Sequence, residues 1–384
     1  MSNGHLILLA SMLVTFVLGS VHAFSVFIVP LENLLLLPRS EISLIYSFAL
    51  VALTLAVLLG YRIYALLPSW WLVLLTCLLA ACGLLLASTA TSWWMLFAGY
   101  SLAFGFCNGV GYGYSLQLVG RVLPQIRGFA MGAVTAAYAL GSIVFARIFA
   151  WRIAVESVTS ALTTIAACLV IGGFVAALVL RLTRASYAIP SDAGNDPGGS
   201  IDRVKVVQFW FVYMASVFAG LMAIGHAAGI ALSKNADASL ATLAAVTIGI
   251  GSAFGGFLAG WLVDRWPVTR LLIALPLLAS GALLVISILP GAVASVLLLS
   301  LVGFSYGSII AVYPVAIASF FGDKGPQAYG QVFTAWGFAG LLAPWIAGLM
   351  YDWRGGYGLA MVIAASIALL SALGAAIFRL EPGA

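Results

Sequence analysis

The sequence has very little charge. Only 7% of its 384 residues are Asp, Glu, Lys or Arg, whereas 64% are apolar. Soluble globular proteins have about 25% charged residues, so this chain has too few polar side chains to cover itself with a hydrated surface. The composition predicts an integral, multi-pass membrane protein that lies in a lipid bilayer.

Residues that bind metals or act as nucleophiles are also scarce. The four cysteines lie inside apolar runs and have no CxxC spacing. The three histidines are far apart in the sequence, and the spans around them contain no acidic residue. No metal-binding or nucleophile–base set assembles from these residues, so we expect no enzyme, no cofactor and no resident metal. The cysteines are Cys77, Cys82, Cys107 and Cys168, and the histidines are His5, His22 and His226.

Apolar runs of about 20 residues, the length that crosses a bilayer core, recur along the whole chain. They predict an all-α membrane protein with twelve transmembrane helices. One connection, rich in Pro, Gly, Asp and Ser, is longer than the others and predicts a mobile linker near the middle of the chain. The spans are expected at 5–30, 41–61, 69–88, 93–120, 128–150, 156–181, 204–232, 239–263, 268–289, 292–320, 327–350 and 356–379.

A segment of the first half recurs in the second half. Residues 105–146 align without a gap with residues 303–344, which pairs the aromatic side chain of Tyr138 with that of Trp336. Membrane helices rich in small residues match one another by chance, but an ungapped match over two helices and their turn is harder to obtain. Two related halves are typical of secondary transporters, which hold the solute between them. We therefore expect two pseudo-symmetric six-helix bundles, residues 1–181 and 204–384, joined by a cytoplasmic linker at 182–203.

The basic residues are distributed unevenly between the two sides of the membrane. Eleven of the sixteen Lys and Arg residues fall on the side of the termini and the linker, and five fall on the other side. Cytoplasmic loops carry an excess of basic residues, so both termini are expected in the cytoplasm, with the chain in a bacterial inner (plasma) membrane. This topology accounts for the net charge of +5, and no nucleic-acid partner is expected.

Polar side chains within the spans concentrate on the first, fourth, seventh and tenth helices. A polar stripe is costly against lipid, so these helices are expected to share a wet interior between the bundles. Hydrogen bonding between helices is the alternative explanation for each of these residues. The candidate substrate contacts are His22, Asn108, Tyr112, His226, Tyr306, Tyr313 and, on the eleventh helix, Gln331.

His22 and His226 occupy related places on the first helix of each half, which predicts that they face each other across a central cavity. Histidine titrates near neutral pH, so each could bind a carboxylate or pass a proton, and both are candidates for proton coupling. The alternative is that each packs against neighbouring helices. Met222 lies four residues before His226 and leaves open a soft-metal (copper) importer, although the next span offers no further ligand.

The end of the eighth span contains Gly260, followed four and five residues later by Asp264 and Arg265. This pattern resembles the Gly-x-x-x-Asp-Arg loop motif of the major facilitator superfamily. The resemblance implies a gate on the cytoplasmic side, and the equivalent first-half loop, which has no acid, puts a symmetric gate in doubt. The candidate gating residues are Asp264, Arg265, Arg270 and Arg127.

Further segments resemble the oxalate/formate antiporter and monocarboxylate transporter branches of that superfamily. They are residues 19–31, 109–112, 127–132 and 334–352. The resemblance implies a rocker-switch carrier of small organic anions that works by proton symport or anion exchange.

This chain departs from the oxalate carriers in its charged residues. Those carriers place an Arg in the eighth span and a Lys in the eleventh, but residues 239–263 and 327–350 contain neither. A dianion would lack its two counter-charges, which favours a monocarboxylate-like solute. A facilitator or exchanger of a neutral or weakly charged solute stays open as an alternative. The chain is expected to work as a monomer.

Overall fold

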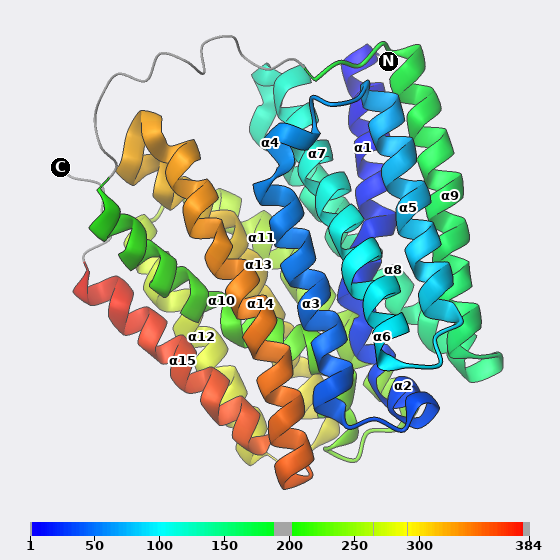
Figure 1. The fold of residues 1–384 in the computed structure, drawn as a ribbon. Coiled ribbons are helices and arrows are strands. Elements are labelled where there is room, and N and C mark those ends of the chain that lie inside the picture. Colours follow the sequence, from blue (N-terminus) through cyan, green and yellow to red (C-terminus); the bar gives the residue numbers. More distant parts are fainter. Residues whose placement is uncertain (1, 188–201, 264, 290, 379–384) are drawn as a thin grey trace.

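The computed structural model describes residues 2–187, 202–263, 265–289 and 291–378, and most of these residues are helical. The first half runs from blue to green in Figure 1. Its 3-10 and π segments are named η in the text. Its segments are α1 (Asn3–Leu18), η1 (Gly19–Val26), α2 (Ile28–Leu35), α3 (Arg39–Leu58), α4 (Gly60–Ile63), α5 (Ser69–Ser88), α6 (Trp93–Leu96), η2 (Phe97–Phe104), α7 (Gly105–Val122), η3 (Pro124–Ile126), α8 (Arg127–Val155) and α9 (Val158–Leu182).

The second half runs from green to red in Figure 1. Its segments are α10 (Arg203–Leu232), α11 (Ala238–Val263), α12 (Val268–Ile288), α13 (Ala292–Phe321), η4 (Gly322–Lys324), α14 (Gly325–Arg354) and α15 (Gly358–Ile377).

Each of the twelve predicted spans corresponds to a helix or to consecutive helical segments. Eleven described helices are long and apolar enough to cross a membrane. The predicted fourth span, 93–120, is divided because the π-helical segment η2 separates α6 from α7. The prediction of an all-helical chain built from membrane-spanning elements is confirmed.

The first span differs from the single helix predicted at 5–30. The α-helix ends at Leu18, and the 3-10 segment η1 follows it before α2 begins. Two causes are visible at this point. Gly19 is a poor helix former, and the side-chain amide of Asn108 on α7 donates a hydrogen bond of 2.6 Å to the carbonyl of Leu18.

Equivalent glycines bring the fourth helix of each half onto its second helix. Gly105 of α7 lies so close to Ala49 of α3 that a side chain would collide with the backbone there. Gly303 of α13, its match in the repeat, lies against the backbone of Ile248 on α11 in the same way. Small residues let membrane helices approach closely, so the sequence repeat is reproduced as a packing repeat.

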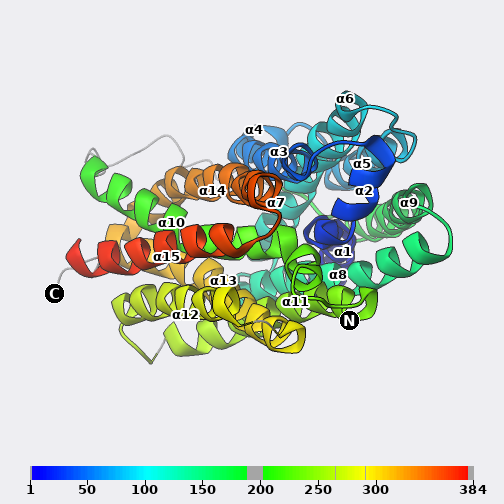
Figure 2. The ribbon, with the colours of Figure 1, turned by 90° about the horizontal axis from the view of Figure 1, so that it is seen from below.

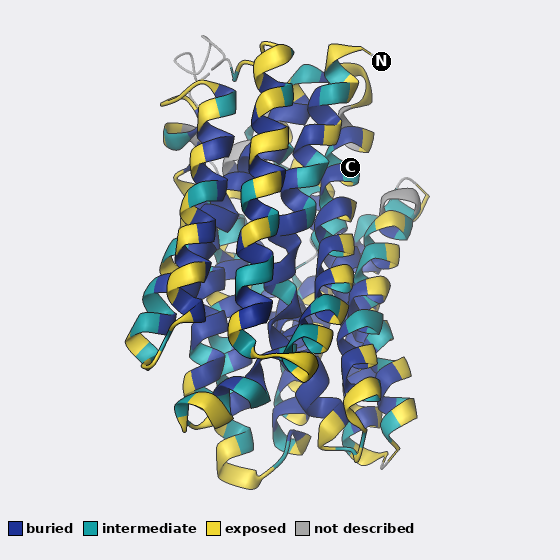
Figure 3. Cartoon of the chain, turned by 90° about the vertical axis from the view of Figure 1, so that its right-hand side faces the viewer, coloured by how far each residue is buried: buried dark blue, intermediate teal, exposed yellow. Residues whose placement is uncertain are grey.

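The helices of the two halves converge on one side of the molecule and spread apart on the other (Figure 1). They spread apart where α9 ends and α10 begins, and we call this the linker side. The opposite side, with α2 and the turn between α14 and α15, is the far side. The view in Figure 2 shows α14 beside α3 and α8 beside α11, the contacts that join the halves. Figure 3 shows buried residues on helix faces that meet other helices and exposed residues on outward faces.

Most of the predicted linker, 182–203, lies outside the described residues. Its first residues pack on the first half, where the Tyr187 hydroxyl donates to the side-chain carbonyl of Gln117. The Tyr187 ring also lies 3.9 Å from the guanidinium of Arg121. The beginning of the predicted mobile linker is therefore anchored. The division into residues 1–181 and 204–384 stays a prediction.

Candidate functional site

His22 lies on η1, near the place where the two halves meet. Its Nδ1 is 2.7 Å from the hydroxyl of Tyr46 on α3, and its ring packs edge-on against Tyr138 of α8 at 5.5 Å. Within the described residues, no protein group bonds its Nε2, and the side chain is partly exposed. The imidazole therefore has one nitrogen that orients it and one that can meet a solute.

Asn108 supports the position of His22 through two hydrogen bonds to neighbouring residues. Its amide donates to Leu18, the residue before η1, and its side-chain carbonyl accepts a hydrogen bond of 2.8 Å from the Tyr138 hydroxyl. Asn108 is 0% exposed, so these protein partners use both ends of its amide. The residue thus fixes the start of the segment that carries His22 and the tyrosine that packs on it.

Tyrosine side chains lie around His22. Tyr112 is partly exposed, with its ring centroid 4.8 Å from that of Tyr138. Tyr306 of α13 accepts a hydrogen bond of 2.9 Å from the indole N–H of Trp336 on α14. The Tyr46 hydroxyl is bonded to His22, whose ring also packs on that of Tyr138. We call Tyr46, Tyr112, Tyr138 and Tyr306 the tyrosine cluster; the first three lie around His22 on the first half, and Tyr306 lies on α13 of the second half.

Two other predicted contacts lie elsewhere. Tyr313 is fully buried, and its ring packs on that of Tyr213 of α10 at 4.2 Å. Gln331 is exposed on α14, and its backbone carbonyl accepts a hydrogen bond from Thr334. Thr334 in turn accepts a hydrogen bond of 2.9 Å from the indole of Trp210. Gln331 is therefore the accessible one of these two predicted contacts.

His226 has surroundings quite unlike those of His22. It is 0% exposed, and both of its ring nitrogens have protein partners. Nδ1 lies 2.8 Å from the Tyr357 hydroxyl, and Nε2 lies 2.8 Å from the backbone carbonyl of Pro344 and 3.3 Å from the hydroxyl of Ser43. The expected pair of facing histidines is therefore not what the structure shows, because His226 is packed into the far-side contact between the halves.

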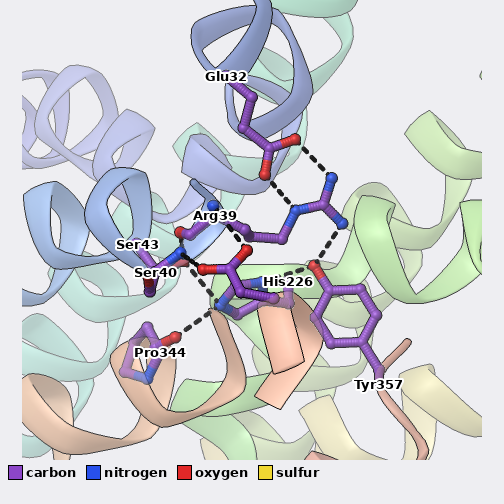
Figure 4. A network of polar contacts seen from close by, with 8 residues as sticks. Glu32, Arg39, Ser40, Ser43, His226, Pro344 and Tyr357 are labelled. Atoms are coloured by element: carbon purple, nitrogen blue, oxygen red, sulfur yellow. Dashed lines mark hydrogen bonds and ion pairs between the residues drawn. The ribbon is translucent and has the colours of Figure 1, made fainter. Parts of the chain in front are cut away.

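An ion-pair network continues from His226 across the far side (Figure 4). The Arg39 guanidinium at the start of α3 pairs with Glu32 of α2 and donates a hydrogen bond of 3.1 Å to the Tyr357 hydroxyl. Burial raises the pKa of Tyr357 above its usual range, so the hydroxyl keeps its proton and can donate to His226. The Arg39 guanidinium also lies 3.7 Å from the centre of the Tyr351 ring.

The predicted gating residues that the structure describes, Arg127, Arg265 and Arg270, lie on the linker side. Asp264 lies outside the described residues, and for Arg127 only its place at the start of α8 is described. Arg265 and Arg270 are exposed, on either side of the turn between α11 and α12. Their predicted role in a gate therefore stays a prediction.

Metal ligands do not gather around the copper alternative. Among the described residues, no three His, Cys, Asp or Glu side chains are grouped so that they could hold a metal ion. Met222 is buried at 1% exposure, and hydrogen-bond partners surround both ring nitrogens of His226. The pair is accounted for by packing and hydrogen bonding.

An apolar cavity of about 520 Å³ lies on the flank of the first half, between α5 and the η2–α7 segment. Leu79, Leu86 and Leu102 line it and are 40–50% exposed. No predicted substrate contact lines it. Its position and apolar surface suit contact with lipid chains.

Sequence reasoning missed the residues that support the site and join the halves. Glu32, Arg39 and Asp352 lie just outside the predicted spans, where charged side chains are inexpensive and indicate only topology. Tyr46 carried a usable signal, because it lies three residues after Ser43 in the middle of an apolar helix and therefore on the same helical face.

Comparison with known proteins shows which family has this architecture. Residues 7–322 match the Major Facilitator Superfamily. The chain is 24% identical over 356 residues to an uncharacterized MFS-type transporter, YhjX, of Escherichia coli (strain K12), and the match covers 88% of this chain and 85% of YhjX.

Solved structures share the fold at low sequence identity. The inward-open xylose transporter XylE from E. coli has a TM-score of 0.75 and 14% identity, over 97% of this chain and 95% of XylE. A bacterial homolog of the human lysosomal transporter Spinster, in an inward-facing conformation, has a TM-score of 0.72 and 14% identity, over 99% of this chain and 98% of the homolog. The all-helical, twelve-span fold is thus the one expected from the sequence. The chain belongs to the Major Facilitator Superfamily, whose members are membrane transporters and not enzymes.

Proposed function

We propose that this transporter carries a small monocarboxylate, with the carboxylate bound beside His22 and a proton held on the imidazole. The observation that carries this proposal is that His22 is partly exposed and that its Nε2 has no hydrogen-bond partner among the described residues. A charged imidazolium can hold one carboxylate, and the tyrosine hydroxyls can donate further hydrogen bonds to it. The resemblance to the oxalate/formate and monocarboxylate branches favours the same class of solute.

Charge balance limits the solute to a single negative charge. Residues 239–263 and 327–350 of the second half contain no Arg or Lys. Arg39 is already paired with Glu32 in the far-side network. A dianion at His22 would keep one unpaired charge, and burial of an unpaired charge is strongly unfavourable.

Proton and anion are proposed to bind together. An isolated imidazolium is disfavoured in an apolar setting, and so is an isolated carboxylate. Each stabilises the other, so the neutral pair crosses at a lower free-energy barrier than either ion alone. His22 is the proposed coupling residue, whereas His226, with both ring nitrogens bonded, is proposed to have a structural role.

Alternating access requires that one half rock against the other. With the linker side in the cytoplasm, as the excess of basic residues favours, this structure is closed to the outside and its halves spread apart toward the cytoplasm. The rocking units are proposed to be residues 1–181 and 204–384 of a single monomer. Arg127, Asp264, Arg265 and Arg270 are proposed to gate the cytoplasmic side once the halves close there.

A neutral solute is the second candidate. Its support is the set of uncharged hydrogen-bonding groups in the second half, where Trp336 bonds Tyr306 and Trp210 bonds Thr334. Aromatic rings with polar edges can hold a hydroxylated solute without any ionic partner.

Transport by purified protein in proteoliposomes distinguishes these alternatives. We expect counterflow of acetate or lactate to rise as the pH falls from 7.5 to 5.5, and oxalate and a neutral sugar to show none. His22→Gln should reduce monocarboxylate transport about 10–100-fold, because a neutral amide cannot supply the positive charge and the proton that the imidazolium offers to the carboxylate. His5→Gln is the matched control, since His5 is exposed near the N-terminus and bonded to Ser2. Oxalate counterflow as fast as that of lactate, or an unchanged rate in His22→Gln, would overturn the proposal, and sugar counterflow alone would favour the second candidate.

A further inference from the structure

The first turn of α3 is capped by a residue from the opposite half of the protein. The helix starts after Pro38, whose side chain has no oxygen to accept a hydrogen bond from the exposed backbone N–H groups. Asp352, near the end of α14, takes over this task. Its Oδ1 accepts a hydrogen bond of 2.9 Å from the Arg39 backbone N–H, and its Oδ2 accepts one of 2.8 Å from that of Ser40.

This cap differs from the other aspartate caps of the described structure. Asp237 bonds the backbone N–H of Leu240 in its own helix start, and Asp202 does the same for Val204. Those caps move with the helix that they stabilise. The cap by Asp352 joins residues 312 and 313 positions apart in the chain, so it is lost when α3 and α14 separate.

The same point is sealed by close packing and by the Arg39 network. A side chain at Gly348 of α14 would lie 2.6 Å from the Ser43 hydroxyl and 2.9 Å from the Arg39 carbonyl. Three C-terminal side chains, from Tyr351, Asp352 and Tyr357, converge on Arg39.

His226 completes the contact with a directional chain of hydrogen bonds. The Arg39 guanidinium donates to the Tyr357 hydroxyl, which can then donate only its own proton, and His226 Nδ1 is the acceptor within reach. Nε2 then carries the ring proton and donates to Pro344. This order of donors and acceptors is satisfied by a neutral imidazole, so the contact is complete without a charge on His226.

We propose that Asp352, seated by Gly348, is the latch that holds the far side of the transporter closed, through a helix cap that exists only in the closed state. Opening of the far side breaks both hydrogen bonds, leaves the first backbone N–H groups of α3 to water and separates the Asp352 carboxylate from the positive end of the helix dipole. The helix that the latch caps also reaches the candidate site, because Tyr46, the partner of His22, is one turn beyond Ser43 on α3.

This inference rests on the alternating-access function proposed above, but it does not depend on the solute. Its test therefore reads the conformation of the full-length protein without any substrate. If the latch fails while monocarboxylate transport is observed, only the latch is wrong. If the latch is observed and no monocarboxylate moves, only the assignment of the solute is wrong.

Spin labels on the far side report the opening. Labels are placed at Thr91, exposed in the connection between α5 and α6, and at Val293, exposed at the start of α13, so that they report on the far side from different halves. The four native cysteines are replaced by alanine, and distances are measured by double electron–electron resonance in nanodiscs. Asp352→Ala should increase the ratio of the long-distance to the short-distance population about fivefold or more, because state changes of this kind are typically coupled by at least that factor.

Matched variants separate the latch from general damage. Asp237→Ala removes an aspartate cap on the same side but within one half, and it should leave the distance distribution unchanged. Gly348→Ala should shift the distribution in the same direction as Asp352→Ala, whereas Gly281→Ala, whose added methyl group would meet no atom within 4 Å, should not.

The measured distance distributions either support or overturn the proposed latch. An unchanged distribution in Asp352→Ala, or an equal shift in Asp237→Ala, would overturn it. Should Asp352→Ala fail to fold, Asp352→Asn retains one acceptor and removes the charge, so it should give a smaller shift in the same direction. A wild-type distribution in both Asp352→Asn and Gly348→Ala would likewise overturn the proposal.

Discussion

His22 and His226 have related positions in the two halves but opposite surroundings. His22 has one ring nitrogen bonded to Tyr46 and retains partial exposure, whereas His226 is fully buried with partners on both nitrogens. Both partners on α3, Tyr46 and Ser43, lie on one face of that helix. A polar residue within a membrane protein can thus bind a solute or join packed helices. The two roles differ in whether the protein itself satisfies all of the residue's hydrogen bonds.

The difference between the histidines follows the difference between the two sides of the molecule. On the far side the halves are in contact, so His226 meets the Ser43 side chain of the first half as well as the Tyr357 side chain and the Pro344 carbonyl of its own half. His22 lies on η1, beside Tyr46 and Tyr138, and keeps a nitrogen without a protein partner among the described residues. If the proposed rocking motion occurs, the two environments change together, since α3 contacts both residues.

The largest expected effect comes from removal of the charge that organises the surroundings of His226. Arg39→Met leaves Glu32 as a mostly buried carboxylate without its partner, and loss of one member of a buried ion pair costs about 3–5 kcal/mol. The free energy of unfolding, measured by denaturant titration in detergent micelles, should fall by that amount.

The control is a solvent-exposed ion pair on the same side of the molecule, whose attraction is screened by water. Arg152→Met breaks the pair with Glu156, whose side chain is 45% exposed, and should lower the free energy of unfolding by about 0–1 kcal/mol. Equal losses in the two variants would show that burial of the Arg39 network contributes nothing to stability.

The next effect sharpens the comparison between the histidines directly. His226→Leu leaves the proton of the Tyr357 hydroxyl without its acceptor and removes the ring N–H that bonds the Pro344 carbonyl, at a cost of about 1–3 kcal/mol for an unsatisfied buried group. His226→Gln should restore most of that loss, because an amide can accept from the hydroxyl and donate to the carbonyl. The pH dependence of lactate uptake should be that of the parent in His226→Gln and should be lost in His22→Gln. A flattened pH profile in His226→Gln would contradict this assignment, because it would show that His226 takes part in carrying the coupled proton.

Much of the fold could be predicted from the sequence because it depends on composition and periodicity. Apolar runs set the twelve spans, and the ungapped repeat between 105–146 and 303–344 appears in the structure as equivalent packing by Gly105 and Gly303. The 3-10 segment η1 could not be foreseen, since it depends partly on a hydrogen bond from Asn108, which is 90 residues away from Leu18.

The site could be predicted only in part, for a physical reason. The residues of the first and fourth spans were identified because polar groups inside apolar helices are rare, and His22, Asn108 and Tyr112 do gather near one another. Their separate roles depend on which hydrogen bonds the neighbouring helices supply, and periodicity carries no information on that. The far-side network could not be predicted from the sequence for a related reason. A charge at a span end has the same sequence signature whether it faces water or a partner from the other half.

The smallest expected effect breaks the link that the two histidines share through α3. Tyr46→Phe removes the hydroxyl bonded to His22 but keeps the ring, which stacks on Phe24 with centroids 5.3 Å apart. A single hydrogen bond contributes about 0.5–1.5 kcal/mol, so lactate uptake should fall about 2–10-fold. The loss should be similar at every pH, because His22 keeps its titrating ring and loses only the partner that orients it. Tyr100→Phe is the control, since its ring packs on the same Phe24 at 5.1 Å and makes no bond to His22. Uptake of lactate is measured from pH 5.5 to 8 in both variants. Equal uptake in Tyr46→Phe and Tyr100→Phe would show that the Tyr46 hydroxyl does not position His22. The link from the site to the far side would then depend on helix packing alone.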